Sequence, residues 1–300
     1  MAKILFVGDV HLKGSTPISR KDNYSETILK KLEWVHSYAD SIDCKDIIFL
    51  GDIFDTVNTS LQYFSLCLST FKKIADSGIN LYTIVGNHDI KYDSIDTLPI
   101  TPLGILIKSN IIKMLEELYI EDVYIKGVQY TEHPSRNLSE NSYFSIMVAH
   151  RFYESAFNEE PISKHNLVDW CFDTYILGHD HRPYLTVELE EEGKHISLFR
   201  PGSLARNSSD QYNRLRKPRV LVFDTLSKYF YYEEVPSESG IDVFFDRVKE
   251  EKLPSMSELV LYLKESYHTA DTSIRDYVNN ADMPDKTKSL VISYLDMLGA

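Results

Sequence analysis

Side chains of the kinds that bind metal ions follow five apolar stretches of this sequence, at the point where each stretch ends. The third stretch, residues 81–85, runs directly into Gly86-Asn87-His88-Asp89. Asn87 offers a neutral amide oxygen as a ligand, and His88 offers a proton that can be exchanged near neutral pH. The other four stretches end at Asp9 and His11, at Asp52, at His150, and at His179 and His181. This repetition predicts one shared site built from strand ends.

The chemistry that these residues indicate is that of paired metal ions. Mixed nitrogen and oxygen ligands suit Mn, Fe or Zn, and no thiolate stands among them to demand a softer metal. The ligands outnumber what one ion needs, so the pattern predicts two ions about 4 Å apart with a carboxylate as their bridge. Such a pair lowers the pKa of a shared water and clamps a phosphate group during in-line attack.

A single histidine is much weaker evidence for a metal site than the whole set of residues. His150 alone would be interpreted as a hydrogen-bonded core residue, since buried polar groups normally find such partners. The histidines outside the set follow no buried strand, and we interpret them as surface or local structural residues: His36, His133, His165, His195 and His268.

Strands and helices alternate through much of the chain. Apolar runs predict buried strands at residues 3–8, 46–50, 81–85, 143–149 and 173–177. Apolar residues at helical spacing predict helices over 24–41 and 60–77 and a mostly helical segment over 101–118. A further strand is predicted over 126–130. This alternation predicts an α/β fold with mostly parallel pairing and covering helices. Residues 184–235 change to strands and turns, so we expect a second, more antiparallel sheet region there, with a hairpin at 190–194 and pairing of 219–223 with 229–235.

Composition narrows the class of protein. The chain has 300 residues, 43% of them hydrophobic, and a formal net charge of -13, which argues against a broad electrostatic grip on DNA. The three cysteines show no C-x-x-C spacing, so a disulfide framework or a cysteine zinc site is not expected. Met1-Ala2-Lys3 leads straight into a strand, with no signal peptide and no apolar run long enough to span a membrane. We therefore expect a cytoplasmic protein with no membrane association.

The last part of the chain differs from the rest. Residues 236–240 read as a linker, and residues 241–300 are acidic and helical in pattern. We expect one domain over 1–235 and a helical C-terminal segment over 241–300. That segment either completes the core of the first domain or binds a partner.

The motifs as a set resemble a known family. Their residues are Asp9-x-His11, Gly51-Asp52-x-x-Asp55, Gly86-Asn87-His88-Asp89, His150 and Gly178-His179-x-His181. In this order they are similar to the five motifs of the calcineurin-like metallophosphoesterases, over roughly residues 4–182, and Gly202-Ser203 extends the likeness. The resemblance implies an α/β fold, a two-sheet sandwich flanked by helices (αββα), here with a small helical C-terminal segment.

The resemblance also implies roles for the residues that match. One ion would be bound by Asp9, His11 and His181, and the other by Asn87, His150 and His179. Asp52 would bridge the two ions. His88 would stabilise the phosphate group or protonate the leaving oxygen, and Asp89 and Asp55 would orient the ligands from behind.

Some motifs are most similar to the SbcD-like nuclease subunits and their tailed-phage relatives. These motifs are Gly51-Asp52-Ile53-Phe54-Asp55-Thr56, Gly178-His179-Asp180-His181-Arg182-Pro183 and the stretch from Thr83 to Asp89. The likeness implies a DNA exonuclease or endonuclease of recombination and repair that uses Mn, with Fe, Zn or Mg as alternatives. It implies as partner an SMC-like ABC ATPase bound through the C-terminal helices, and it is compatible with a homodimer.

Two features depart from that likeness. The chain between the third and fourth motifs is short, and the only basic stretch is local. That stretch, with Arg182 before it, offers phosphate contacts from Arg182, Arg206, Arg214 and Arg216, although a solvated loop would look the same.

Two competing functions stay open. A phosphatase or phosphodiesterase for a small molecule or a protein would use the same motifs, although Asp55-Thr56-Val57 and Asp89 differ from the protein-phosphatase pattern. A non-catalytic scaffold is disfavoured, because every ligand position and His88 are intact.

Overall fold

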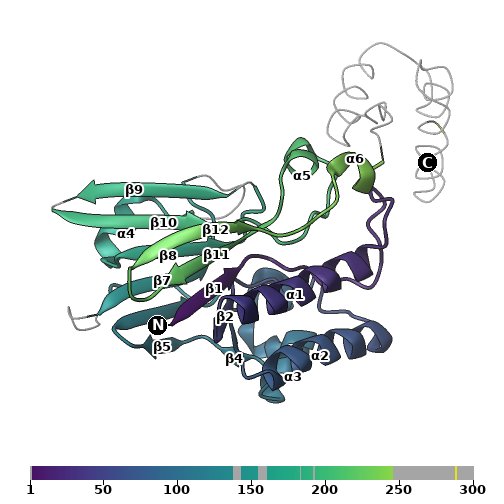
Figure 1. The fold of residues 1–300 in the computed structure, drawn as a ribbon, viewed down its shortest axis with the longest axis horizontal. Coiled ribbons are helices and arrows are strands. Elements are labelled where there is room, and N and C mark those ends of the chain that lie inside the picture. Colours follow the sequence, from purple (N-terminus) through teal and green to yellow (C-terminus); the bar gives the residue numbers. More distant parts are fainter. Residues whose placement is uncertain are drawn as a thin grey trace, which may run out of the picture. The chain divides into compact units, whose positions relative to one another are not determined.

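Two six-stranded sheets form the body of the protein (Figure 1). The computed structural model describes residues 2–137, 143–154, 161–182, 184–191, 193–245 and 288. Apolar side chains of both sheets meet in one core that includes Phe6, Ile48, Val148 and Ile176. The predicted two-sheet α/β sandwich is therefore confirmed.

The first sheet has the strand order β12-β11-β1-β2-β3-β4. Its parallel strands are β1 (Lys3–Val7), β2 (Asp46–Phe49), β3 (Asn80–Thr83) and β4 (Lys113–Met114). The antiparallel strands β11 (Arg219–Asp224) and β12 (Tyr229–Glu234) continue it beyond β1. Because β1, β2 and β3 run in the same direction, the loops that follow them leave the sheet at one edge.

The second sheet has the strand order β5-β6-β7-β8-β10-β9. Its parallel strands are β6 (Val123–Val128), β7 (Phe144–His150), β8 (Thr174–Gly178) and β10 (Lys194–Arg200). The antiparallel edge strands are β5 (Glu117–Ile120) and β9 (Leu185–Glu191). In the register of β7 and β8, His150 lies opposite Gly178, which brings the fourth and fifth motifs together.

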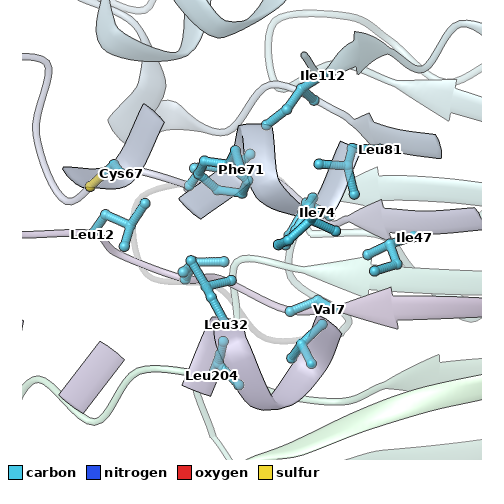
Figure 2. Packing of buried hydrophobic residues seen from close by; sticks show 14 of the residues in the cluster. Val7, Leu12, Leu32, Ile47, Cys67, Phe71, Ile74, Leu81, Ile112 and Leu204 are labelled. Atoms are coloured by element: carbon cyan, nitrogen blue, oxygen red, sulfur yellow. The ribbon is translucent and has the colours of Figure 1, made fainter. Parts of the chain in front are cut away.

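Helices cover the outer faces of the sheets. α1 (Tyr24–Ser41), α2 (Leu61–Asp76) and α3 (Pro102–Lys108) pack on the first sheet. Figure 2 shows this packing, with Leu32 of α1 and Phe71 of α2 set against Val7 and Ile47 of the strands. α4 (Lys164–Trp170) packs on the second sheet through Leu167.

Short helices complete the described chain. Two 3-10 helices, η1 (Asn87–Asp89) and η2 (Ile95–Ile100), follow β3. α5 (Gln211–Leu215) and α6 (Gly240–Val243) lie close together at one end of the domain (Figure 1). Among the described residues, no helix combines the length and the apolar character needed to cross a membrane.

Three expectations from the sequence need correction. The helix predicted over 101–118 ends at Lys108, because Asn110 turns the backbone into the left-handed region with φ 55° and the following residues enter the sheets as β4 and β5. The antiparallel region predicted over 184–235 is divided, since its first hairpin extends the second sheet and its last hairpin extends the first sheet. The first compact unit extends to Phe245, beyond the expected end at residue 235, because Val243 and Phe244 are buried in it. The rest of the expected helical segment, 246–300, lies outside the described residues apart from Lys288.

Candidate metal centre

The centre is formed by the loops that follow β1, β2, β3 and β8, together with the last residue of β7. Three of its residues bend the backbone sharply: φ is 49° at His11, 48° at Asp52 and 77° at His179, all in the left-handed region. Such backbone is costly outside glycine and is typical of functional sites. Gly51 has φ 88°, and a Cβ on it would lie 2.6 Å from Nδ1 of His150. Glycine is therefore required there for close approach of the loop to the ligand set.

Two groups of ligand atoms meet in these loops. Asp9, His11, Asp52 and His181 place one ligand atom each within 4.8 Å of one another, and Asp52, His150 and His179 form a second such group. Asp52 belongs to both groups. The structure thus brings together the residues that the sequence assigned to two ions, with the expected bridging residue between them.

Unpaired polar atoms lie at the centre of these groups. Oδ2 of Asp9 and Oδ2 of Asp52 are buried and accept no hydrogen bond from the described part of the chain. Nε2 of His11 and Nε2 of His181 approach each other to 2.9 Å. The two imidazole nitrogens can share one hydrogen, but buried carboxylate oxygens without a donor are costly unless a cation lies beside them, so the donor set fits divalent metal ions.

His150 is held as a ligand by its second nitrogen. Nδ1 lies 2.7 Å from the Leu50 carbonyl oxygen, which can only accept, so Nδ1 carries the hydrogen. Nε2 then faces the site, 3.3 Å from Oδ2 of Asp52 and 3.2 Å from Oδ1 of Asn87. Although burial lowers it, the pKa of His150 is raised to about 9 by the negative charge of Asp52. Metal binding must therefore displace a proton from this residue.

The comparison with protein families agrees with this geometry. The family model described as calcineurin-like phosphoesterase matches residues 2–183, which is more than half of the chain. The chain belongs to this family. No curated protein gives a significant match to this calcineurin-like phosphoesterase. Membership indicates metal-dependent hydrolysis of phosphoesters, and all of the motifs lie inside the matched residues.

The pKa values of the two central carboxylates of the phosphoesterase, Asp9 and Asp52, are shifted in opposite directions. Oδ1 of Asp9 accepts a hydrogen bond of 2.9 Å from the His179 backbone N–H, yet complete burial raises the pKa of Asp9. Burial would also raise the pKa of Asp52, but the positive charge of His150, whose Nε2 lies 3.3 Å from Oδ2, opposes burial and the pKa of Asp52 is lowered. Among the imidazoles, burial and the charge of His11 lower the pKa of His181 to about 3, so its lone pair stays available to a cation.

His88 is exposed at the mouth of the site, whereas Asp9, His11, Asp52 and His150 are buried. Its Nδ1 lies 2.7 Å from the Asp55 carbonyl oxygen, which leaves Nε2 as the nitrogen that can exchange a proton with a ligand. Its ring packs edge to face with the ring of His11, with centroids 4.9 Å apart. His88 therefore stands beside the ligand groups and belongs to neither of them.

Asp55 and Asp89 support the loops of the phosphoesterase. Oδ1 of Asp55 lies 3.5 Å from Nδ1 of His11, and Lys13 binds the other oxygen at 2.7 Å. Although burial opposes it, these partners lower the pKa of Asp55 to about 2. Asp89 is buried and accepts hydrogen bonds from the backbone N–H groups of Gly86 and Phe54 at 3.0 and 3.3 Å. Burial, followed by the charge of Asp52, raises the pKa of Asp89 to about 7.

The loop of residues 202–206 supports the backbone of Asp9, a role that the sequence did not indicate. Oγ of Ser203 donates a hydrogen bond of 2.8 Å to the Asp9 carbonyl oxygen, and the Leu204 N–H donates another of 3.1 Å. Buried cationic side chains bind the four successive carbonyl oxygens of residues 203–206. These side chains are Arg216, which binds two of the oxygens, Lys31 and Arg20. The Gly202-Ser203 likeness was the only signal for this loop in the sequence.

The four arginines expected to contact phosphate have different environments. Arg206 and Arg216 are buried, and their guanidinium groups bind backbone carbonyls, so their phosphate contacts stay predictions. Arg214 binds the backbone carbonyls of Ser209 and Phe245. Arg182 is 45% exposed and pairs with Asp180 at 2.6 Å, beside the ligands His179 and His181. Arg182 is therefore the best placed of the four to meet a substrate.

Proposed function

We propose that this phosphoesterase is a two-metal phosphodiesterase that cleaves DNA, as the nuclease subunit of a recombination or repair complex. The observation that supports two metal ions is that Asp52 belongs to both groups of ligand atoms. A carboxylate in that position can hold two cations close together, as two-metal phosphoryl chemistry requires.

The residues that would hold the ions follow from the ligand groups. Asp9, His11 and His181 would bind one ion, and His150, His179 and Asn87 would bind the other, with Asp52 between them. When bound, the ions would supply an activated water and neutralise charge on the phosphate. The ligands suit Mn, Fe or Zn, and Mn is the proposed metal because of the likeness of the motifs to SbcD-like nucleases.

His88 is the proposed proton donor to the leaving oxygen. It is exposed beside the ligand groups, and its Nδ1 is fixed by the Asp55 carbonyl, so its Nε2 can meet a bound phosphodiester. Asp55 positions His11, and Asp89 anchors the turn that carries Asn87 and His88. These contacts hold the reacting groups in place before the substrate binds.

The DNA substrate and the ATPase partner are supported by the likeness of the motifs to SbcD-like and phage nuclease subunits. The protein-phosphatase alternative has less support, since Asp89 stands where those enzymes carry a glutamate. In this proposal, residues beyond Phe245 bind the SMC-like ABC ATPase.

A parallel assay tests the proposal. Purified full-length protein with Mn is incubated with linear duplex DNA, single-stranded DNA and bis-p-nitrophenyl phosphate, with and without EDTA. We expect EDTA-sensitive hydrolysis of the small diester and of at least one DNA substrate. Hydrolysis of the small diester alone would contradict the DNA assignment, and no hydrolysis of any of the three substrates would contradict the phosphodiesterase assignment.

A further inference from the structure

A groove of about 620 Å³ is lined by residues of α5 and by residues at the start of β11 and the end of β12, and the mechanism proposed above does not use it. Its lining includes Tyr184, Tyr212, Leu215, Lys217 and Arg219. The volume is in the range of sites that bind organic ligands. The lining combines exposed aromatic and apolar side chains with cations, in a protein whose net charge is -13.

The groove and the metal centre share two segments of chain. Tyr184 follows the ligand His181 by three residues, at the start of the strand that leaves the fifth motif. On the other wall, Arg216 lines the groove and also binds the carbonyls of Ser203 and Ala205, in the loop that holds Asp9. A chain that occupies the groove would therefore lie next to the site of cleavage.

The aromatic surfaces of the groove suit nucleobases. Tyr212 and Leu215 stand three residues apart on α5, on one face of the helix, and are 56% and 76% exposed. The Arg219 guanidinium stacks on the Tyr184 ring at 4.0 Å from its centroid, which builds a second flat surface. Bases of any sequence stack on the tyrosine and guanidinium surfaces, and Leu215 adds an apolar contact beside Tyr212.

The charges of the groove suit a phosphate backbone. Lys217 and Arg219 both pair with Glu234, at 3.0 and 2.7 Å, and Glu234 is the one acid in the described lining. The two partly exposed cations therefore outnumber the one anion, while Arg216 lines the groove with its guanidinium bound to backbone carbonyls. Each pair is partly exposed, so the cations can exchange Glu234 for a phosphate at little cost.

We infer that this groove binds a single-stranded segment of the nucleic acid substrate, with bases on Tyr212 and Leu215 and phosphates against Lys217 and Arg219. The inference rests on the proposed function for its choice of occupant. Because the groove lies beside the fifth motif, it would guide a strand toward the ions.

The test measures binding of a fluorescein-labelled oligothymidylate to the full-length protein by anisotropy, in EDTA to prevent cleavage. We expect Tyr212→Ala to weaken binding about tenfold, which is the loss typical of one stacked base. Lys217→Ala should lower the slope of log affinity against log salt by about 0.7, as for one lost phosphate contact on a single strand. Glu234→Gln should tighten binding, because it releases both cations.

Matched controls come from elsewhere in the domain. Asp76→Asn removes the same charge beside Lys72 on α2, and Tyr229→Ala removes a tyrosine that is 63% exposed on β12. Both controls should bind like the wild type. Wild-type affinity in Tyr212→Ala and Lys217→Ala would overturn the inference, as would a wild-type protein that does not bind the oligonucleotide.

Hydrolysis of bis-p-nitrophenyl phosphate by the wild type with Mn separates the two proposals. Hydrolysis without groove-dependent DNA binding would reject the groove and leave the phosphodiesterase standing. Groove-dependent binding without hydrolysis would support the groove and contradict the proposed activity.

Discussion

The backbone N–H of His88 donates a hydrogen bond of 2.9 Å to Oδ1 of Asp52. The bond joins the loop after β2 to the loop after β3. It uses one carboxylate oxygen of Asp52 for structure and leaves Oδ2, the oxygen without a donor, for cations. The residue between the two ligand groups thus also fixes the backbone of the proposed proton donor.

Asp52→Asn is expected to keep the loop and lose the metals. The asparagine oxygen can still accept the His88 N–H, but the second anionic oxygen is gone. We expect bound metal to fall from two ions to one or none and diester hydrolysis to fall at least about a hundredfold. Metal analysis and hydrolysis rates check this, with Asp43→Asn, an exposed aspartate paired with Lys45, as the control. Two-ion binding would be ruled out by a single tight ion in the wild type together with an active Asp52→Asn.

His88→Ala is expected to keep both ions and lose activity. His88 belongs to neither ligand group, and loss of a general acid typically costs about a hundredfold or more. His150→Ala, by contrast, should lose metal, because Nε2 of His150 faces Asp52. His165→Ala, an exposed histidine paired with Asp169, is the control. The assigned roles would be wrong if His88→Ala lost metal while His150→Ala retained it.

Phe244→Ala is expected to destabilise the domain, and Phe245→Ala is not. Phe244 is fully buried, and the guanidinium groups of Arg20, Arg206 and Arg214 lie over its ring at 5.5, 5.9 and 5.7 Å from the centroid. Truncating a buried phenylalanine typically costs about 3–5 kcal/mol of unfolding free energy. Phe245 is 53% exposed, so its truncation should cost less than about 1 kcal/mol. Chemical denaturation of the two variants compares them, and equal costs would contradict the assignment of Phe244 to the core.

A chain that ends at Phe245 is expected to keep diester hydrolysis and to lose stimulation by the SMC-like ABC ATPase that we propose as its partner. This end point retains Val243 and Phe244, whereas a chain that ends at Val235 would lose both and be unstable. The assay mixes each chain with the ATPase and ATP and follows DNA degradation, with the small diester as the internal standard. Full ATP stimulation of the chain ending at Phe245 would show that the partner binds elsewhere.

Lys31 should make stability depend on pH in the alkaline range. Burial, followed by the charges of Arg206 and Arg216, holds the pKa of Lys31 in the folded protein well below its ordinary value of 10.5. Between the folded pKa and 10.5 the unfolded chain binds the proton and the folded chain does not. Stability therefore rises with pH in that window, by at most about 1.4 kcal/mol per unit, and the penalty is complete below the folded pKa.

Lys31→Met removes the titrating group and serves as the reference for the wild type. The unfolding free energy of the wild type minus that of Lys31→Met should increase with pH up to about 10.5. Taking the difference cancels the contributions of other groups, including the buried tyrosines. A difference that stays constant from neutral pH to 10.5 would contradict the low pKa of Lys31.

The ligand residues of the centre could be predicted because their signal is local. An apolar strand followed at once by Asp52 or His150 is visible in a few consecutive residues, and parallel strands bring such ends together. The helices over 24–41 and 60–77 were predictable for the same reason, since their apolar spacing is continuous.

The cationic residues around the loop of 202–206 could not be predicted in this way. In the sequence Arg206 and Arg216 look like part of a basic patch, and Arg20 looks like part of a polar loop. Their partners are backbone carbonyls, which every residue carries and which leave no mark in the sequence. The division of residues 184–235 between two sheets escaped prediction because either sheet can accept an antiparallel hairpin at its edge.

The hydrogen bond from Ser203 to the Asp9 carbonyl joins residues that are 194 positions apart in the chain. Contacts of such long sequence separation close large loops, and proteins that depend on them fold slowly. Asp9 lies in the loop after β1, yet its turn is completed by residues that follow β10. Competence to bind metal is therefore expected to be acquired late in refolding, after the two sheets have formed.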